Sequence, residues 1–238
     1  MNTRNQVVCA WAGLVGLALI FVGLLLAGYV PAPRADATPG EIAAFYRDGT
    51  FTIRLGLFLG LIGSAGWAAL VSVVWVQLSH IEGPRPVLAA LQAVAGAACY
   101  VLLTLFVVLL AAAAFRPERA PESTQLLHDI GWFMAFLAAV PFVLQALATG
   151  AAILGDRSPQ PAYPRWLGYL GLWVAVLLAP GDVLLFFHTG PFAYDGLISY
   201  WIPLFGFGGW MAALSWGALR LARAESAEPA SAVEAPAQ

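Results

Sequence analysis

Asp182 is the one acidic side chain that the sequence places well inside a long apolar segment. A carboxylate at that depth costs about 3 kcal/mol in hydrocarbon unless it is paired, protonated or hydrated. Pro180 and Gly181 stand directly before it, and they predict a bent or unwound turn with free backbone carbonyls. Interruptions of this kind mark the binding sites of many transporters. The sequence therefore predicts that Asp182 is the polar anchor of a ligand-binding site.

Other polar and aromatic side chains collect on the same membrane face as Asp182. Connectivity alone brings together there the ends of the third and fifth apolar segments and the starts of the second, fourth and sixth. The further candidate ligand-binding residues on this face are Arg54, His128, Asp129, His188, Tyr200 and Trp201. Arg54 is the best candidate for an ion pair with Asp182, or it extends to the lipid headgroups. Tyr200 and Trp201 would rim the site, or would belong to the aromatic belt at the membrane surface.

A metal or acid–base site can be assembled on paper from His128, Asp129, Asp182, His188 and Asp195. Their spacing matches no zinc signature, and the sequence lacks the paired-histidine motifs of membrane di-iron enzymes. Two transmembrane haems with histidine ligands would need more than the 3 histidines present, and His80 falls on the opposite face. The 2 cysteines have no CxxC spacing. We therefore expect no metal and no cofactor.

Catalysis by side chains alone stays open as an alternative. The sequence contains no nucleophile elbow, no phosphate-binding loop and no dinucleotide-binding fingerprint. Asp182 could nevertheless donate a proton within an aromatic pocket formed with Phe186, Tyr200 and Trp201, which is a device for acid catalysis. That arrangement would suit an integral-membrane cyclase or isomerase.

The elements that must position these residues follow from composition. Of 238 residues, 61% are hydrophobic and only 10% are charged, too few charges to cover a water-soluble surface. The mean hydropathy of +0.81 indicates a multi-pass membrane protein. A net charge of −2 without a basic block excludes nucleic acid as a partner. All 11 cations are arginine, and with the abundant Ala, Gly and Pro this indicates a bacterial genome rich in GC, hence a bacterial inner membrane.

Six segments are long and apolar enough to cross a bilayer as helices. They are predicted at Val7–Val30, Ile53–Leu78, Val87–Phe115, Ile130–Leu154, Trp166–Phe187 and Leu197–Leu221. The expected fold is thus all-α, a six-helix bundle over residues 1–223 followed by a disordered tail at 224–238. Six spans place both termini on one side, and the arginines next to the span ends favour the cytoplasmic side.

A short helix is predicted between the first two spans. Thr38 and Glu41 have the spacing of a capping box, Pro39 suits the first helical position, and Gly49 can end the helix. Its apolar side chains at helical spacing are Ile42, Phe45 and Tyr46. We expect this helix to lie at the membrane interface. It would either simply cover the bundle or act as a lid over an outer cavity.

Prolines interrupt only the last three spans, at Pro141, Pro180 and Pro203. Broken helices in lipid need protein or water to satisfy the freed backbone groups, which favours a cavity there. A stripe of small residues directs Asp182 toward the interior rather than lipid. The leading hypothesis is a protein that binds or moves a small hydrophobic or weakly polar molecule, in a cavity bounded by spans two, four, five and six.

Asp182→Asn is then expected to remove binding and to leave folding intact. A third alternative is a structural subunit of a membrane complex. Membrane lipids are expected partners in every case, and a membrane-protein partner or a second copy of the chain stays open.

Overall fold

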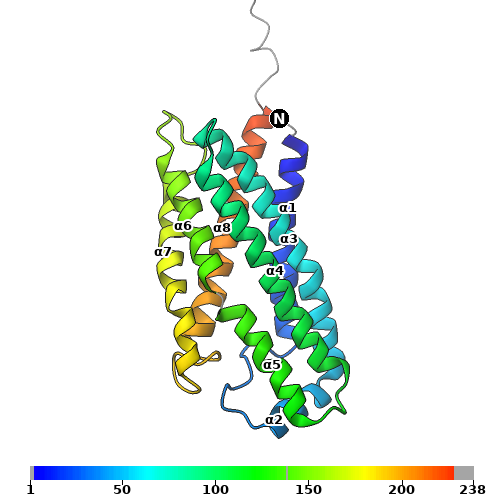
Figure 1. Cartoon of the computed structure of the whole chain (residues 1–238). Coiled ribbons are helices and arrows are strands. Elements are labelled where there is room, and N and C mark those ends of the chain that lie inside the picture. Colours follow the sequence, from blue (N-terminus) through cyan, green and yellow to red (C-terminus); the bar gives the residue numbers. More distant parts are fainter. Residues whose placement is uncertain (1–2, 138, 228–238) are drawn as a thin grey trace, which may run out of the picture.

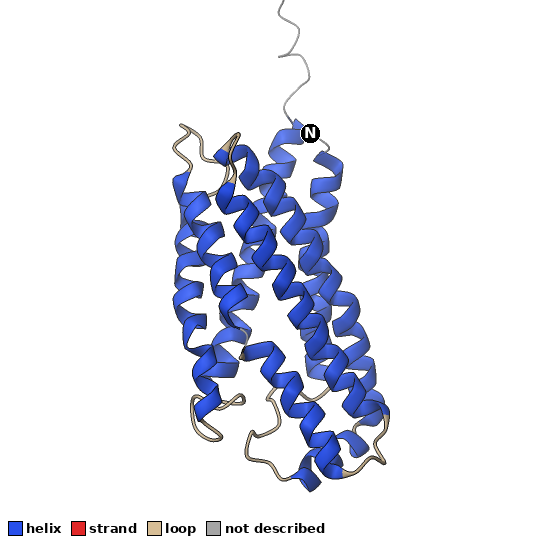
Figure 2. Cartoon of the chain, viewed as in Figure 1, coloured by secondary structure: helices blue, strands red, loops and turns tan. Residues whose placement is uncertain are grey.

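The computed structural model describes residues 3–137 and 139–227, which contain helices, turns and loops but no strand (Figures 1 and 2). Six helical stretches in these ranges are long and apolar enough to cross a membrane. The prediction of an all-α chain with six spans is therefore confirmed.

The first three spans are single helices and the last three are interrupted. The single helices are α1 (Thr3–Leu26), α3 (Thr50–Glu82) and α4 (Val87–Phe115). The fourth span combines α5 (Pro121–Phe136) with α6 (Ala139–Gly155), and it begins at Pro121 rather than at the predicted Ile130. The fifth combines α7 (Arg165–Leu178) with a 3₁₀ helix, η1 (Ala179–Phe186). The sixth combines a short π-helix, η2 (Leu197–Trp201), with α8 (Ile202–Ala227).

Proline explains where these interruptions fall. Pro141 is the third residue of α6, Pro180 the second of η1 and Pro203 the second of α8. A proline is accommodated in the first turn of a helix, where its missing N–H has no partner to lose, but not in the interior. The fourth span therefore stops and restarts close to its proline, whereas the fifth and the sixth change helix type there without a gap.

Both described ends of the chain lie at one end of the molecule, which we call the terminal face; α2 (Pro39–Asp48) lies at the opposite end, the α2 face (Figure 1). The Gln6 side chain donates to the Glu225 carboxylate at 3.2 Å, which ties the start of α1 to the end of α8. Helix α8 continues to Ala227, so residues 224–227 of the predicted tail are helical. The rest of that tail lies outside the described residues.

The spans form a closed ring of neighbours. Helix α1 packs against α3 and α8, α3 against α4, α4 against α6, α6 against α7, and α7 against α8. Backbones approach most closely between α1 and α3, where a Cβ on Gly16 would lie 2.5 Å from the Gly63 carbonyl oxygen and 2.8 Å from the Gly66 Cα. Small residues permit this approach in a membrane, where dispersion contacts replace the hydrophobic effect between helices.

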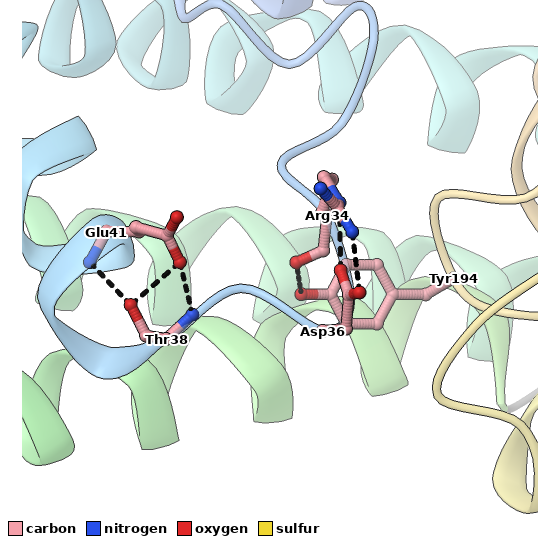
Figure 3. Close-up of polar contacts among 5 residues, drawn as sticks. All are labelled: Arg34, Asp36, Thr38, Glu41 and Tyr194. Atoms are coloured by element: carbon pink, nitrogen blue, oxygen red, sulfur yellow. Dashed lines mark hydrogen bonds and ion pairs between the residues drawn. The ribbon is translucent and has the colours of Figure 1, made fainter.

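Helix α2 has the predicted capping box. The Glu41 backbone N–H donates to the Thr38 hydroxyl at 3.3 Å, and the Thr38 N–H donates back to the Glu41 carboxylate at 2.7 Å (Figure 3). The Thr38 N–H and the Thr38 hydroxyl both donate to the Glu41 carboxylate, and they hold the pKa of Glu41 below its usual value. The helix packs against α5, with Ile42 and Tyr46 buried.

The α1–α3 contact predicts a strong difference between two glycines. Gly16→Ala should lower the free energy of unfolding by about 1–3 kcal/mol, because the added methyl meets backbone atoms that cannot move aside. Gly209→Ala on α8 is the matched control, since a Cβ there has no described heavy atom within 4 Å. Thermal unfolding of the purified protein in detergent measures both. Equal melting temperatures for the two variants would contradict this packing.

Candidate functional site

The three interruptions surround one cavity. A space of about 140 Å³ is lined by Ala139 at the start of α6, Gly181 in η1 and Pro203 at the start of α8. The opposite wall comes from α1 and α4, through Leu17 and Leu103 among others. This wall corrects the predicted boundary, because α1 and α4 contribute residues and α3 contributes none. Helix α3 instead lines a smaller cavity of about 40 Å³.

The cavity is lined almost wholly by hydrophobic side chains. Two lining residues carry hydrogen-bonding side chains, Trp132 and Tyr200, and both groups are already paired. The Trp132 indole N–H donates to His128 Nε2 at 3.0 Å, and the Tyr200 hydroxyl donates to the Tyr29 carbonyl. An apolar cavity of this size stays dry and accepts a group as large as a benzene ring. The chemistry of the wall therefore suits an apolar ring or chain end.

A buried group of side chains borders the cavity through Trp132 and Tyr200. We call it the His128 cluster; its members are Tyr29, Tyr46, His128, Trp132, Tyr194 and Tyr200. The side chains of all six residues are 5% exposed or less. The Trp132 ring stacks on Phe136 at 5.6 Å and on Tyr194 at 5.8 Å, so aromatic packing supplies most of the contact area.

Hydrogen bonds fix the protonation of the cluster. An indole N–H can only donate, so His128 Nε2 must accept from Trp132, and the imidazole proton is on Nδ1. That proton faces the Tyr46 hydroxyl at 2.9 Å, and the Tyr29 hydroxyl donates to Tyr46 at 3.1 Å. Burial raises the pKa of both tyrosines, so their hydroxyls stay protonated. The chain of bonds joins the loop after α1 to α2 and α5.

Two loops cover the molecule at the α2 face. Arg34 and Asp36 form an ion pair at 2.6 Å, and the Tyr194 hydroxyl donates to the Arg34 carbonyl at 3.3 Å (Figure 3). Tyr194 belongs to the connection between η1 and η2, whereas Arg34 belongs to the loop that leads into α2. We call α2 and these two loops the covering layer. It is thus held to the cavity walls both through α2 and through the loops.

The structure places Asp182 in the wall of the cavity without making it a lining residue. It lies in η1, half-buried, and its carboxylate accepts a hydrogen bond from the Ala139 N–H at 3.3 Å. Ala139 is the first residue of α6, so Asp182 satisfies a backbone donor that the interrupted fourth span leaves free. Ala139, which donates this bond, and Gly181, the residue before Asp182, both line the cavity.

Arg54 has other partners than the predicted one. Its guanidinium donates to the carbonyls of Ala114 at 3.1 Å and Phe115 at 2.9 Å, at the end of α4. The predicted Arg54–Asp182 ion pair is therefore not formed. Arg54 satisfies backbone acceptors at a helix end, which is another use of a cation at that position.

The remaining predicted residues divide into two groups. His128 and Tyr200 are brought together in the His128 cluster. Trp201 packs beside them, 5.2 Å from Tyr200 and edge-on to it, whereas Asp129 is half-buried and His188 is exposed. Within the described part of the chain, no three His, Cys, Asp or Glu side chains come together as a metal site.

Sequence reasoning missed Tyr29, Trp132 and the apolar wall residues of α1. Tyr46 had a usable signal, because it was predicted on the apolar face of the short helix. Trp132 also had one: it stands four residues after His128, which places both side chains on one helix face. Nothing in the sequence shows that α1 lies beside the cavity, since that depends on the order of the helices in space.

Comparison with known proteins gives no lead: no family model, curated protein or solved structure matches this chain.

The His128 cluster predicts different roles for two histidines. His128→Leu removes the acceptor of the Trp132 indole and a partner of Tyr46, and leaving such groups unpaired in the interior should cost about 1–3 kcal/mol of stability. His188→Leu, at an exposed position, is the control and should change stability little. Thermal unfolding monitored by near-ultraviolet circular dichroism measures both. The interpretation fails if His128→Leu melts with the wild type.

Proposed function

We propose that this protein binds or moves a small hydrophobic or weakly polar molecule within the membrane, in the cavity between its interrupted spans. The single observation that carries the proposal is an apolar cavity of about 140 Å³ at the point where three broken helices meet. Uninterrupted helices could pack without such a space. The interruptions in the last three spans lie beside one another and leave backbone groups that must be covered.

The proposed setting is a bacterial inner membrane, with the six spans in one bundle and both termini in the cytoplasm. Arginines next to the span ends at the terminal face support that orientation. The α2 face is then outward, α2 lies at the interface, and the cavity belongs to the outer half. A ligand that is soluble in lipid would arrive from the bilayer.

Among the alternatives, binding is favoured over acid catalysis by the position of Asp182. A catalytic acid must reach the reacting atoms, whereas the Asp182 carboxylate faces the Ala139 N–H behind the wall. The structural-subunit alternative needs outward stripes of small residues. Gly168, Gly171 and Ala175 are instead buried, and both glycines pack on α6.

Filling the cavity should abolish ligand binding. Gly208 lines it, and a Cβ there has its nearest neighbour at 3.8 Å, in Leu17. Gly208→Leu should therefore place its side chain in the cavity. Gly209→Leu is the matched control, one residue along the same helix at an exposed position with open space around it. The probe is a fatty acid bearing a photoreactive diazirine, added to protein in nanodiscs, with labelled peptides located by mass spectrometry.

The expected result is labelling of cavity residues such as Phe136 and Leu204 in the wild type and in Gly209→Leu, with a loss of most of it in Gly208→Leu. If the wild type is not labelled there, or if Gly208→Leu is labelled as strongly as the wild type, the cavity is not a binding site for apolar chains.

Two substitutions of Asp182 separate its proposed roles. Asn keeps a carbonyl oxygen that can accept from the Ala139 N–H, whereas Ala removes it. If Asp182 acts by holding the cavity wall, Asp182→Ala should weaken diazirine labelling and Asp182→Asn should retain most of it. If Asp182 is instead a charged anchor for the ligand, as the sequence predicts, Asp182→Asn should lose most of the labelling. Melting temperatures of both variants show whether a loss of labelling reflects unfolding.

A further inference from the structure

Six side chains have a buried polar atom that lacks a hydrogen-bond partner within the described chain. Two of them are Ser79 on α3 and Ser215 on α8, and the other four lie on α4, α6 and α8. These four are Gln92, Gln145, Thr149 and Trp210, each 0–1% exposed. Their unpaired atoms are Gln92 Oε1, Gln145 Oε1, Thr149 Oγ1 and Trp210 Nε1. Buried polar groups are almost always paired with protein or with ordered water.

The first three of these residues lie across one helix contact. Helices α4 and α6 are antiparallel neighbours (Figure 1), and the Gln145 side-chain nitrogen lies 2.7 Å from the position that a Cβ on Gly96 would take. Gln92 precedes Gly96 by one turn and Thr149 follows Gln145 by one turn. In an antiparallel pair these displacements have the same direction, so Gln92 and Thr149 lie at one level, one turn toward the terminal face.

Trp210 lies at the same level on α8. The Phe142 and Phe207 rings are 5.0 Å apart, which sets α6 and α8 level. Three residues further along each helix stand Gln145 and Trp210. Trp67 provides a second link, because its indole donates to the Gly96 carbonyl at 3.0 Å and its ring lies 6.3 Å from Trp210. We call the region bounded by Gln92, Gln145, Thr149 and Trp210 the central polar site.

The unpaired atoms define the chemistry that fits between them. Trp210 Nε1 can only donate, the two glutamine oxygens can only accept, and the threonine hydroxyl can do both. A cation would be repelled by the indole N–H, and an anion would be repelled by the carbonyl oxygens. A small neutral molecule that both donates and accepts satisfies all four, and water is the smallest such molecule.

The central polar site is separate from the apolar cavity. Phe142, Phe207 and Met211 line the cavity, and Phe142 and Phe207 meet edge-on. Gln145 and Trp210 come one turn beyond this aromatic pair. None of the four residues of the central polar site lines the cavity, so the two regions are neighbours of opposite character.

We propose that the central polar site binds water, which bridges the indole of Trp210 to the side chains of Gln92, Gln145 and Thr149. This inference does not depend on what occupies the apolar cavity. It gives the protein a hydrated site among its spans, out of contact with lipid.

X-ray radiolysis of the protein in nanodiscs tests the proposal, because hydroxyl radicals formed from bound water oxidise side chains that touch it. Trp132 is the internal control: it is as buried as Trp210, at 1% exposure, but its indole is paired with His128 beside the dry cavity. Mass spectrometry should find oxidation of Trp210 several-fold above that of Trp132. Gln145→Leu, which removes one of the water's partners, should reduce this excess. Thr149→Val removes the hydroxyl and keeps the side-chain shape, so it serves as a second variant with the same expected result.

Oxidation of Trp210 no greater than that of Trp132 would overturn the proposal. So would an excess at Trp210 that survives both substitutions, since the water would then have other partners. Diazirine labelling of the apolar cavity has a different probe and different residues, so failure there leaves this result unaffected.

Discussion

The lack of water in a bilayer core is the constraint on which this structure depends. Every backbone N–H and C=O within the spans must find a partner in the protein. In each of the last three spans a proline prevents some of these groups from pairing within the helix. The chain meets the constraint by placing its interruptions together, at Ala139, Gly181 and Pro203, and by covering them with side chains from other spans. The Asp182 carboxylate takes one of the freed donors directly. The cavity is a consequence of how broken backbone is accommodated.

The covering layer at the α2 face works by a second principle, the pairing of every polar atom inside an aromatic core. Tyr29, Tyr46, His128 and Trp132 bond to one another, so rings with polar tips can be buried at no more than 1% exposure. The cluster draws on the first loop, α2 and α5. Because His128 on α5 is 82 residues from Tyr46 in sequence, the cluster fixes α2 over the end of the cavity and gives the connection after α1 a defined path.

Local features of this fold could be predicted from the sequence, and the arrangement of its helices could not. The third span, Val87–Phe115, is observed as predicted, and so are the capping box of Thr38 and the interruptions at the prolines. These depend on neighbouring residues alone. The partner of Asp182 was missed because it is a backbone N–H that becomes free only when the fourth span breaks. Likewise, α1 in the cavity wall and Arg54 at the end of α4 follow from which helices are neighbours, and no local pattern encodes that order.

The contact between the first and last spans has a consequence for how the protein is made. Helix α1 leaves the ribosome long before α8, yet its neighbours are α3 and α8, and Gln6 bonds to Glu225 near the end of α8. During synthesis the flank of α1 that will meet α8 must face lipid until the last helix has been inserted. The ring of spans closes only at that moment, so a nascent chain stalled before α8 would have neither a finished cavity wall nor a partner for Gln6. Until α8 is inserted, the chain is therefore an open, incompletely packed intermediate.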